Sequence, residues 1–339
     1  AKSSPDAAMG VLMGGQGLAL QRQLNFSREA EREADRVGFQ IMSAGGYDPS
    51  GAVAFFKRLQ GVSKVYNEMP AYLSSHPLTG ERIADIQARI RETPARARVD
   101  SLDFHLVRAR ARVLQDPSTK GRAEARTVFN SQLTHLSRQQ QTAGQYGLAF
   151  LALKQGDLAS AQSWLDKARA TLRPREGTAS VERVGGDGAT MFASLALEIR
   201  LAPGQSAAVA QQAVKEAEQA HYKYPLSRGI ARQYADALIA AGKLDEAARF
   251  LRDQVQQYRE EPKLYDQLAK TYAAQGKIAL QHMALAESYV LTGALPAAVA
   301  QLNLARKSSD VSFYDQSVID ARERELEKRQ KEEKEEKDR

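Results

Sequence analysis

Cysteine is absent from the 339 residues of this sequence. The absence excludes disulfide scaffolds, zinc sites held by thiolates, iron–sulfur clusters and cysteine nucleophiles. It leaves the cellular compartment open, because cytosolic and exported proteins can both lack cysteine. Any metal ion that this chain binds must therefore be held by histidine and carboxylate side chains.

Long apolar runs are absent as well. No stretch reaches the roughly 18 apolar residues that a membrane span needs. The best candidate, Met9 to Leu20, is short, rich in glycine and without a basic leader. We therefore expect neither a transmembrane segment nor an intact signal peptide. Because the chain begins with Ala-Lys-Ser-Ser, we expect it to be processed, cut or incomplete.

Nucleic-acid-binding motifs are missing despite a formal net charge of +7, from 48 basic and 41 acidic residues. Seven arginines lie between Arg89 and Arg112, but aromatic residues are not interleaved with them. We interpret this basic excess as a solvated face and expect no nucleic-acid partner.

Strand patterns are nearly absent, and helical patterns dominate the chain. After a glycine-rich start, the sequence predicts helices over 27–44, 49–60 and 79–91, the first ended by Gly45-Gly46. Thr93-Pro94 then interrupts the helical pattern. We place the end of a first domain, residues 1–92, at this point.

A repeated pattern occupies the second predicted domain, residues 93–319. Each of four glycines has an alanine seven residues before it and an aliphatic residue two after it: Gly156, Gly242, Gly276 and Gly293. A glycine suits the turn of a helical hairpin, and small residues let its two helices approach closely. We expect the aliphatic residue to seal the turn. The 34 residues from Gly242 to Gly276 equal the tetratricopeptide (TPR) period, and the pattern resembles a TPR array.

The glycines predict helix pairs near 139–170, 228–258, 262–290 and 280–306, of which the last two share a helix. A degenerate pair is expected at 189–224. Residues 320–339 carry eight basic and nine acidic side chains. They predict a lone charged helical tail that has little to bury and frays.

Glu31 and Asp35 are the first candidates for chemistry. They lie four residues apart on a predicted helix and share one face. One carboxylate on such a face can ligate a metal ion, and the next can orient a neighbouring ligand. A solvated helix rich in glutamate and arginine is the commoner origin of this pattern.

Three short motifs then follow in a fixed order: E-x-x-x-D at Glu31, Gly-Gly-Tyr-Asp-Pro at 45–49, and H-P-x-x-x-x-R from His76 to Arg82. This order resembles the zinc metallopeptidases of the HtpX type. With the TPR-like repeats behind it, it resembles the periplasmic beta-barrel assembly-enhancing proteases among them. The resemblance implies a mainly α fold, in which the C-terminal half of a zincin-type metallopeptidase domain precedes a TPR helical-hairpin solenoid.

The resemblance also implies roles for four residues. Glu31 matches the glutamate that ligates zinc, and Asp35 and Arg82 match residues that support the ligands without binding the metal. His76 matches a histidine on a loop that covers the zinc and holds the site shut. It is therefore expected to be a regulatory switch and a further candidate metal ligand.

The His-Glu-x-x-His helix of that family does not occur in these 339 residues. Its two histidines grip zinc from one helical face, and its glutamate is the general base. We expect this helix to lie upstream of Ala1 and the present chain to be inactive by itself.

The function implied by the resemblance is that of a periplasmic zinc metalloendopeptidase, with one Zn²⁺ per full-length chain, that degrades misassembled beta-barrel proteins. Its implied partners are unfolded or misassembled outer-membrane proteins and, through the TPR domain, the barrel-assembly machinery. The alternative is a non-catalytic TPR adaptor or chaperone that carries a relic peptidase segment. An export signal and a His-Glu-x-x-His motif upstream of Ala1 would favour the peptidase.

Overall fold

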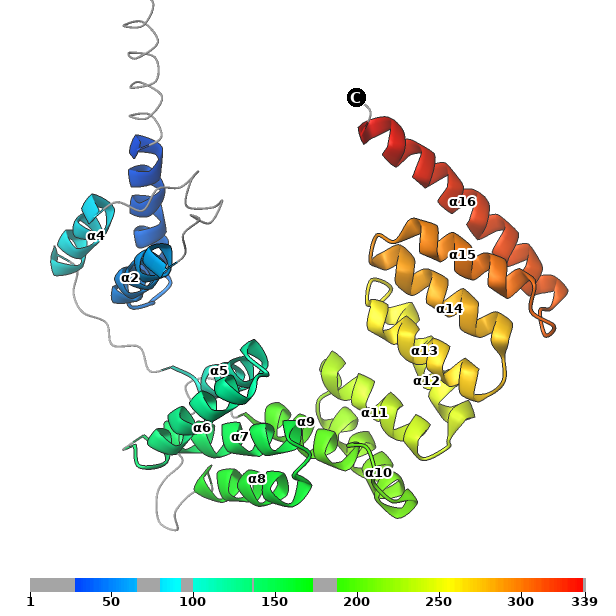
Figure 1. Ribbon diagram of the computed structural model, residues 1–339, viewed down its shortest axis with the longest axis horizontal. Helices are drawn as coiled ribbons and strands as arrows, with labels where there is room; N and C mark the ends of the chain where they lie inside the picture. The colour runs from blue at the N-terminus through cyan, green and yellow to red at the C-terminus, as the bar shows by residue number, and fades with distance from the viewer. Residues whose placement is uncertain (1–27, 66–79, 93–99, 136, 173–187, 338–339) are drawn as a thin grey trace, which may run out of the picture. The chain divides into compact units, whose positions relative to one another are not determined.

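The structure, a computed structural model, describes residues 28–65, 80–92, 100–135, 137–172 and 188–337 (Figure 1). These residues form helices and no strands, which confirms the mainly α fold. The chain divides into two compact units, Ala1–Val99 and Asp100–Arg339. None of the described helices is long and apolar enough to cross a membrane.

Unit 1 contains a helix over 28–44, α2 (Ser50–Val65) and α4 (Gly80–Glu92). The first helix ends at Gly45-Gly46, as the sequence predicts. Gly46 has φ 71°, and the N–H of Tyr47 donates to the carbonyl of Met42 at 2.9 Å. Asp48 then caps α2 by accepting from the N–H of Ser50 at 2.9 Å. α2 extends to Val65, beyond the predicted end at residue 60.

A small apolar core joins the helices of unit 1. Val53 of α2 and Ile83 and Ile86 of α4 are buried, and Phe39 and Phe56 pack against them. This core fixes which face of α4 is turned towards the first helix, and so it positions the polar residues at the start of α4.

Unit 2 is an array of antiparallel helices in which each helix packs against the next (Figure 1). Their bounds are α5 (Leu102–Gln115), α6 (Thr119–Leu133), α7 (Arg138–Lys154), α8 (Leu158–Leu172), α9 (Ala189–Arg200), α10 (Ala207–Lys223), α11 (Arg228–Ala240), α12 (Leu244–Gln257), α13 (Pro262–Ala274), α14 (Ile278–Leu291), α15 (Leu295–Arg306) and α16 (Phe313–Lys337). α9 also contacts α11, and α11 contacts α13. The arrangement is compatible with a TPR-like solenoid, as predicted.

The four glycines that mark the repeat all lie at helix-to-helix turns. Gly156, Gly242, Gly276 and Gly293 have φ between 73° and 78°, a left-handed conformation that costs glycine little. At each turn the next N–H donates to the carbonyl five residues earlier, for example Lys277 to Tyr272 at 2.9 Å. The alanines seven residues before these glycines are buried against the facing helix.

The aliphatic residue after each glycine has a smaller role than predicted. Leu295 is buried, but Ile278 at the equivalent position is 41% exposed, and Leu158 and Leu244 are only half-buried. The expectation that these residues seal every turn is therefore wrong. Alanines three residues further along are fully buried at three of the four turns and close the hairpins instead.

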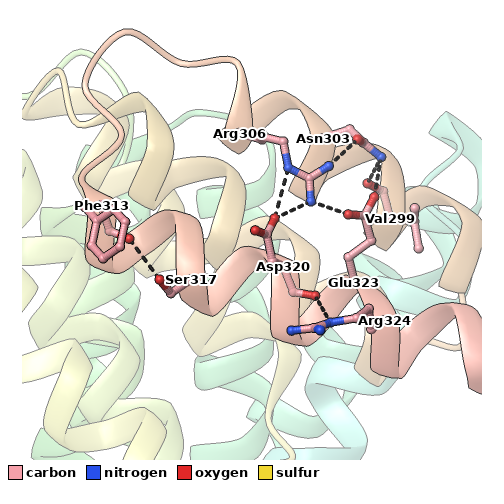
Figure 2. A network of polar contacts seen from close by, with 8 residues as sticks. All are labelled: Val299, Asn303, Arg306, Phe313, Ser317, Asp320, Glu323 and Arg324. Atoms are coloured by element: carbon pink, nitrogen blue, oxygen red, sulfur yellow. Dashed lines mark hydrogen bonds and ion pairs between the residues drawn. The ribbon is translucent and has the colours of Figure 1, made fainter.

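The C-terminal helix α16 also differs from the prediction. It begins at Phe313, so residue 320 lies inside it, and Ile319 and Leu326 are fully buried in a core with residues of α15. Arg306 of α15 pairs with Asp320 at 2.7 Å and with Glu323 (Figure 2). The prediction of a lone helix with little to bury is therefore wrong as far as Leu326. Two apolar residues seven apart share one helical face, and the surrounding charges conceal this pattern in the sequence.

Candidate functional site

Glu31 and Asp35 lie on one face of the helix over 28–44, as their spacing predicts. Only 14% and 9% of their side-chain surfaces are exposed. Neighbouring Glu33 behaves differently: it is exposed and pairs with Arg36 on its own helix. A purely solvated charged helix therefore accounts for Glu33 but not for Glu31 and Asp35.

Arg82, in the first turn of α4, contacts both carboxylates. Its Nε and Nη2 donate to the two oxygens of Asp35 at 2.7 and 2.8 Å, and its Nη1 lies 2.9 Å from Oε2 of Glu31. Only 10% of the Arg82 side chain is exposed. This two-pronged contact with Asp35 fixes the plane of the guanidinium, so that the remaining nitrogen reaches Glu31.

Two further contacts hold Arg82 and its helix in place. The guanidinium carbon of Arg82 lies 5.2 Å from the centre of the Phe56 ring on α2, in a cation–π arrangement. Beside it, Arg32 of the first helix pairs with Glu81 of α4 at 3.0 Å. The first helix and α4 thus supply the cluster of Glu31, Asp35 and Arg82, and α2 contacts it through Phe56.

Three of the four residues that the resemblance singles out are therefore close together. The fourth, His76, lies outside the described residues. The sequence does not predict the Phe56 contact with Arg82 or the Arg32–Glu81 pair, because the spacing of residues that lie 26 and 49 positions apart carries no contact signal. The sequence does not predict the direct contact of Arg82 with Glu31 either, because the order of the motifs indicates that the two residues belong to one site but not that they touch.

The cluster offers carboxylate oxygens, which are among the ligands that zinc takes in proteins. A catalytic zinc site takes three protein ligands, and no group of three histidine, cysteine or acidic side chains lies close enough to bind a metal ion within the described parts of the chain. The residues present therefore fit one side of a zinc site, in which Glu31 would face the metal and Asp35 and Arg82 would hold Glu31 in position.

Comparison with known proteins gives one family match and several relatives. Residues 2–90 match the sequence profile of Peptidase family M48. The chain is 28% identical over 95% of its length to the Beta-barrel assembly-enhancing protease of Escherichia coli strain K12, and 27% identical over 94% to that of Yersinia pestis. A putative beta-barrel assembly-enhancing protease of Vibrio cholerae is 31% identical over 46% of the chain and 32% of its own length.

The chain spans 62% of the length of the first two of these relatives. Its matches cover both units, and the family profile ends within α4, eight residues after Arg82. Residues 2–90 thus resemble Peptidase family M48, and over nearly its whole length the chain is similar to the beta-barrel assembly-enhancing proteases.

Proposed function

We propose that this chain belongs to a periplasmic zinc metalloendopeptidase that acts in outer-membrane protein assembly and quality control by degrading misassembled beta-barrel proteins. The observation that carries the proposal is the joining of Glu31 and Asp35 by Arg82. A solvated charged helix would not need a shielded arginine from another helix beside its carboxylates. Similarity over 95% of the chain to proteases named for beta-barrel assembly supports the same function.

In this proposal Glu31 is a zinc ligand, and Asp35 and Arg82 are positioning residues. Zinc in such a site makes its bound water a nucleophile and polarises the peptide carbonyl. Arg82 fixes the orientation of the Glu31 carboxylate before any metal arrives, because its guanidinium is held on the opposite side by Asp35. His76 is proposed as the residue that gates the site, since histidine can bind zinc and changes charge near neutral pH.

The solenoid of unit 2 is proposed to contact unfolded or misassembled outer-membrane proteins and the barrel-assembly machinery. Stacked helical hairpins offer extended surfaces, which suit clients without a fixed fold. Proteolysis and client binding would then belong to different units of one chain.

The test is a measurement of zinc content and casein digestion on the full-length gene product, with Glu31→Gln as the variant. We expect the variant to lose zinc, with metal affinity lowered by at least about tenfold, and to lose proteolysis. Glu33→Gln is the matched control, because Glu33 lies on the same helix but is exposed. We expect the 339-residue chain alone to be inactive.

Unchanged zinc content in the Glu31→Gln protein would overturn the ligand assignment. A full-length product that neither binds zinc nor cleaves casein, and still binds unfolded outer-membrane proteins, would instead establish the adaptor alternative.

A further inference from the structure

A cleft of about 540 Å³ lies in unit 2 between α8, α9 and α10. Its volume is within the range of small-ligand pockets, which is about 300–1,000 Å³. It is far along the chain from the cluster around Arg82, and none of the residues of that cluster lines it.

α9 forms the middle of the cleft, while its other face is packed, with Leu195 and Ile199 buried in a core shared with α5 and α7. α9 makes less extensive contact with α8 and α10 than α7 makes with α8. Small residues form part of its lining: Ala193 and Ala196 of α9 and Ala220 of α10. Phe192 and Leu197 complete an apolar floor.

The rim of the cleft is basic. Arg169 of α8, Arg200 of α9 and Lys223 of α10 line it, against the single carboxylate of Glu216. Arg200 pairs with Glu216 at 3.3 Å. Lys223 is exposed and pairs with no carboxylate in the described part of the chain, and its ammonium lies 5.3 Å from the Tyr224 ring. Arg169 pairs with Asp166 at 3.9 Å and donates to the carbonyl of Phe192 at 3.4 Å. With Asp166 counted, three cations and two anions leave one positive charge in excess, that of Lys223, beside an apolar floor.

We propose that this cleft docks an acidic peptide segment of a partner protein, which places one aromatic or large aliphatic side chain on the floor and a carboxylate against Lys223 and Arg169. The apolar floor favours a side chain, and the basic rim selects an acidic neighbour. The proposal goes beyond the proposed peptidase function, because it requires neither zinc nor the residues of unit 1.

The turn that follows α10 offers additional contact area. Tyr222 and Leu226 are 90% and 84% exposed, and they flank Lys223 and Tyr224 in the sequence. Tyrosine and arginine are enriched in protein–protein interfaces, where an apolar centre is surrounded by a polar rim. The exposed tyrosine and leucine beside the basic rim of the cleft therefore resemble the residues found at peptide-docking sites.

The test uses fluorescence anisotropy to measure how tightly the 339-residue chain binds a fluorescein-labelled decapeptide. In this peptide a phenylalanine is flanked by aspartates. Two control peptides carry asparagine in place of aspartate, or alanine in place of phenylalanine. The protein variants are Arg169→Glu with Lys223→Glu for the rim, and Ala193→Phe to fill the floor. Lys215→Glu is the matched control, because Lys215 is an exposed lysine of α10 that does not line the cleft.

We expect both control peptides, the rim variant and the floor variant to bind about tenfold more weakly or worse, and binding to weaken with added salt. Lys215→Glu should leave binding unchanged. Thermal unfolding of each variant confirms that the fold is retained; if Ala193→Phe unfolds the array, the rim variant and the peptides still decide the question.

Equal weakening by Lys215→Glu and the rim variant would overturn the proposal, because it would show attraction by net charge alone. No binding of the parent peptide would also overturn it. So would a dimer of the chain, seen by sedimentation, that the rim and floor variants abolish, because the occupant would then be a second copy.

Discussion

Arg82 is shielded from water together with the two carboxylates that it contacts, and this makes its replacement costly. In Arg82→Met, Glu31 and Asp35 lose the guanidinium that they share, and removing one partner of such a shielded ion pair costs about 3 kcal/mol. We expect the unfolding free energy of unit 1 to fall by about that amount. Hydrogen exchange of the helix over 28–44 in increasing urea measures it.

Arg32→Met serves as the control for Arg82. The pair of Arg32 with Glu81 has 57% and 74% of its side-chain surfaces exposed, and exposed pairs contribute about 0–1 kcal/mol. A double variant of Asp35→Asn with Arg82→Met should be less destabilised than the sum of the two single variants. If Arg32→Met and Arg82→Met lowered the unfolding free energy equally, the result would contradict the claim that the shielded contacts of Arg82 stabilise unit 1 more than an exposed ion pair does.

Gly276 tests the backbone requirement of the hairpin turns. Its φ is 73°, and a Cβ added there would meet no atom within 4 Å, so the cost of Gly276→Ala comes from the backbone alone. We expect a loss of about 1 kcal/mol in chemical unfolding of unit 2. Gly229→Ala, within α11, should stabilise the protein slightly, since alanine is the better helix former.

His221 predicts a dependence of stability on pH. Burial lowers the pKa of His221 below its usual 6.5, and its ring lies 5.3 Å from that of Phe250 and 6.0 Å from that of Tyr234. As the pH falls, the unfolded chain therefore binds a proton at His221 before the folded chain does. The contribution of neutral His221 to the unfolding free energy is complete above about pH 6.5 and is lost as the pH falls below that value. His221→Phe should show a smaller drop in Tm from pH 7.5 to 5.5 than the parent; an identical drop would refute this prediction.

At the scale of single elements, α16 is an integral helix of the array. Leu326→Ala removes a fully buried side chain and should lower the unfolding free energy by about 2–4 kcal/mol. Val318→Ala, on the same helix but 38% exposed, should cost less than about 1 kcal/mol. Hydrogen exchange of α16 and thermal unfolding measure both. If the Leu326→Ala protein were as stable as the parent, the result would support the prediction from the sequence that this helix is an unpacked tail.

The elements that the sequence predicts well are those with a local signal. The hairpins at Gly156, Gly242, Gly276 and Gly293 follow from glycine and alanine at fixed spacing, because both residues act within one turn. α5 and α6 were not predicted as a pair, because a Ser118 cap after Asp116 replaces the glycine turn there.

The candidate site shows the same limit. The shared face of Glu31 and Asp35 follows from helical geometry, but their contact with Arg82 depends on how α4 packs, which no local pattern encodes. His76 remains a prediction, since it lies outside the described residues.

For the whole molecule, the two units differ in the size of their cores. In the described residues, unit 1 buries one small cluster around Val53, Ile83 and Ile86, whereas four clusters follow one another along unit 2. Because buried apolar area provides most of the stability, we expect two transitions in urea, with unit 1 unfolding first. Hydrogen exchange assigns each transition, and a single coincident one would contradict the expectation. Arg82→Met should lower the urea midpoint of the first transition and leave that of the second unchanged.

The cleft beside α9 has a consequence for how order spreads through unit 2. In a linear array each helix is stabilised mainly by its neighbours. α9 contacts α8 and α10 less extensively than α14 contacts α13 and α15, although it also contacts α11 and buries Leu195 and Ile199. A ligand that bridges α8, α9 and α10 would add contacts at this point of the array, so that occupation of the cleft would couple the helices before α9 more tightly to those after it.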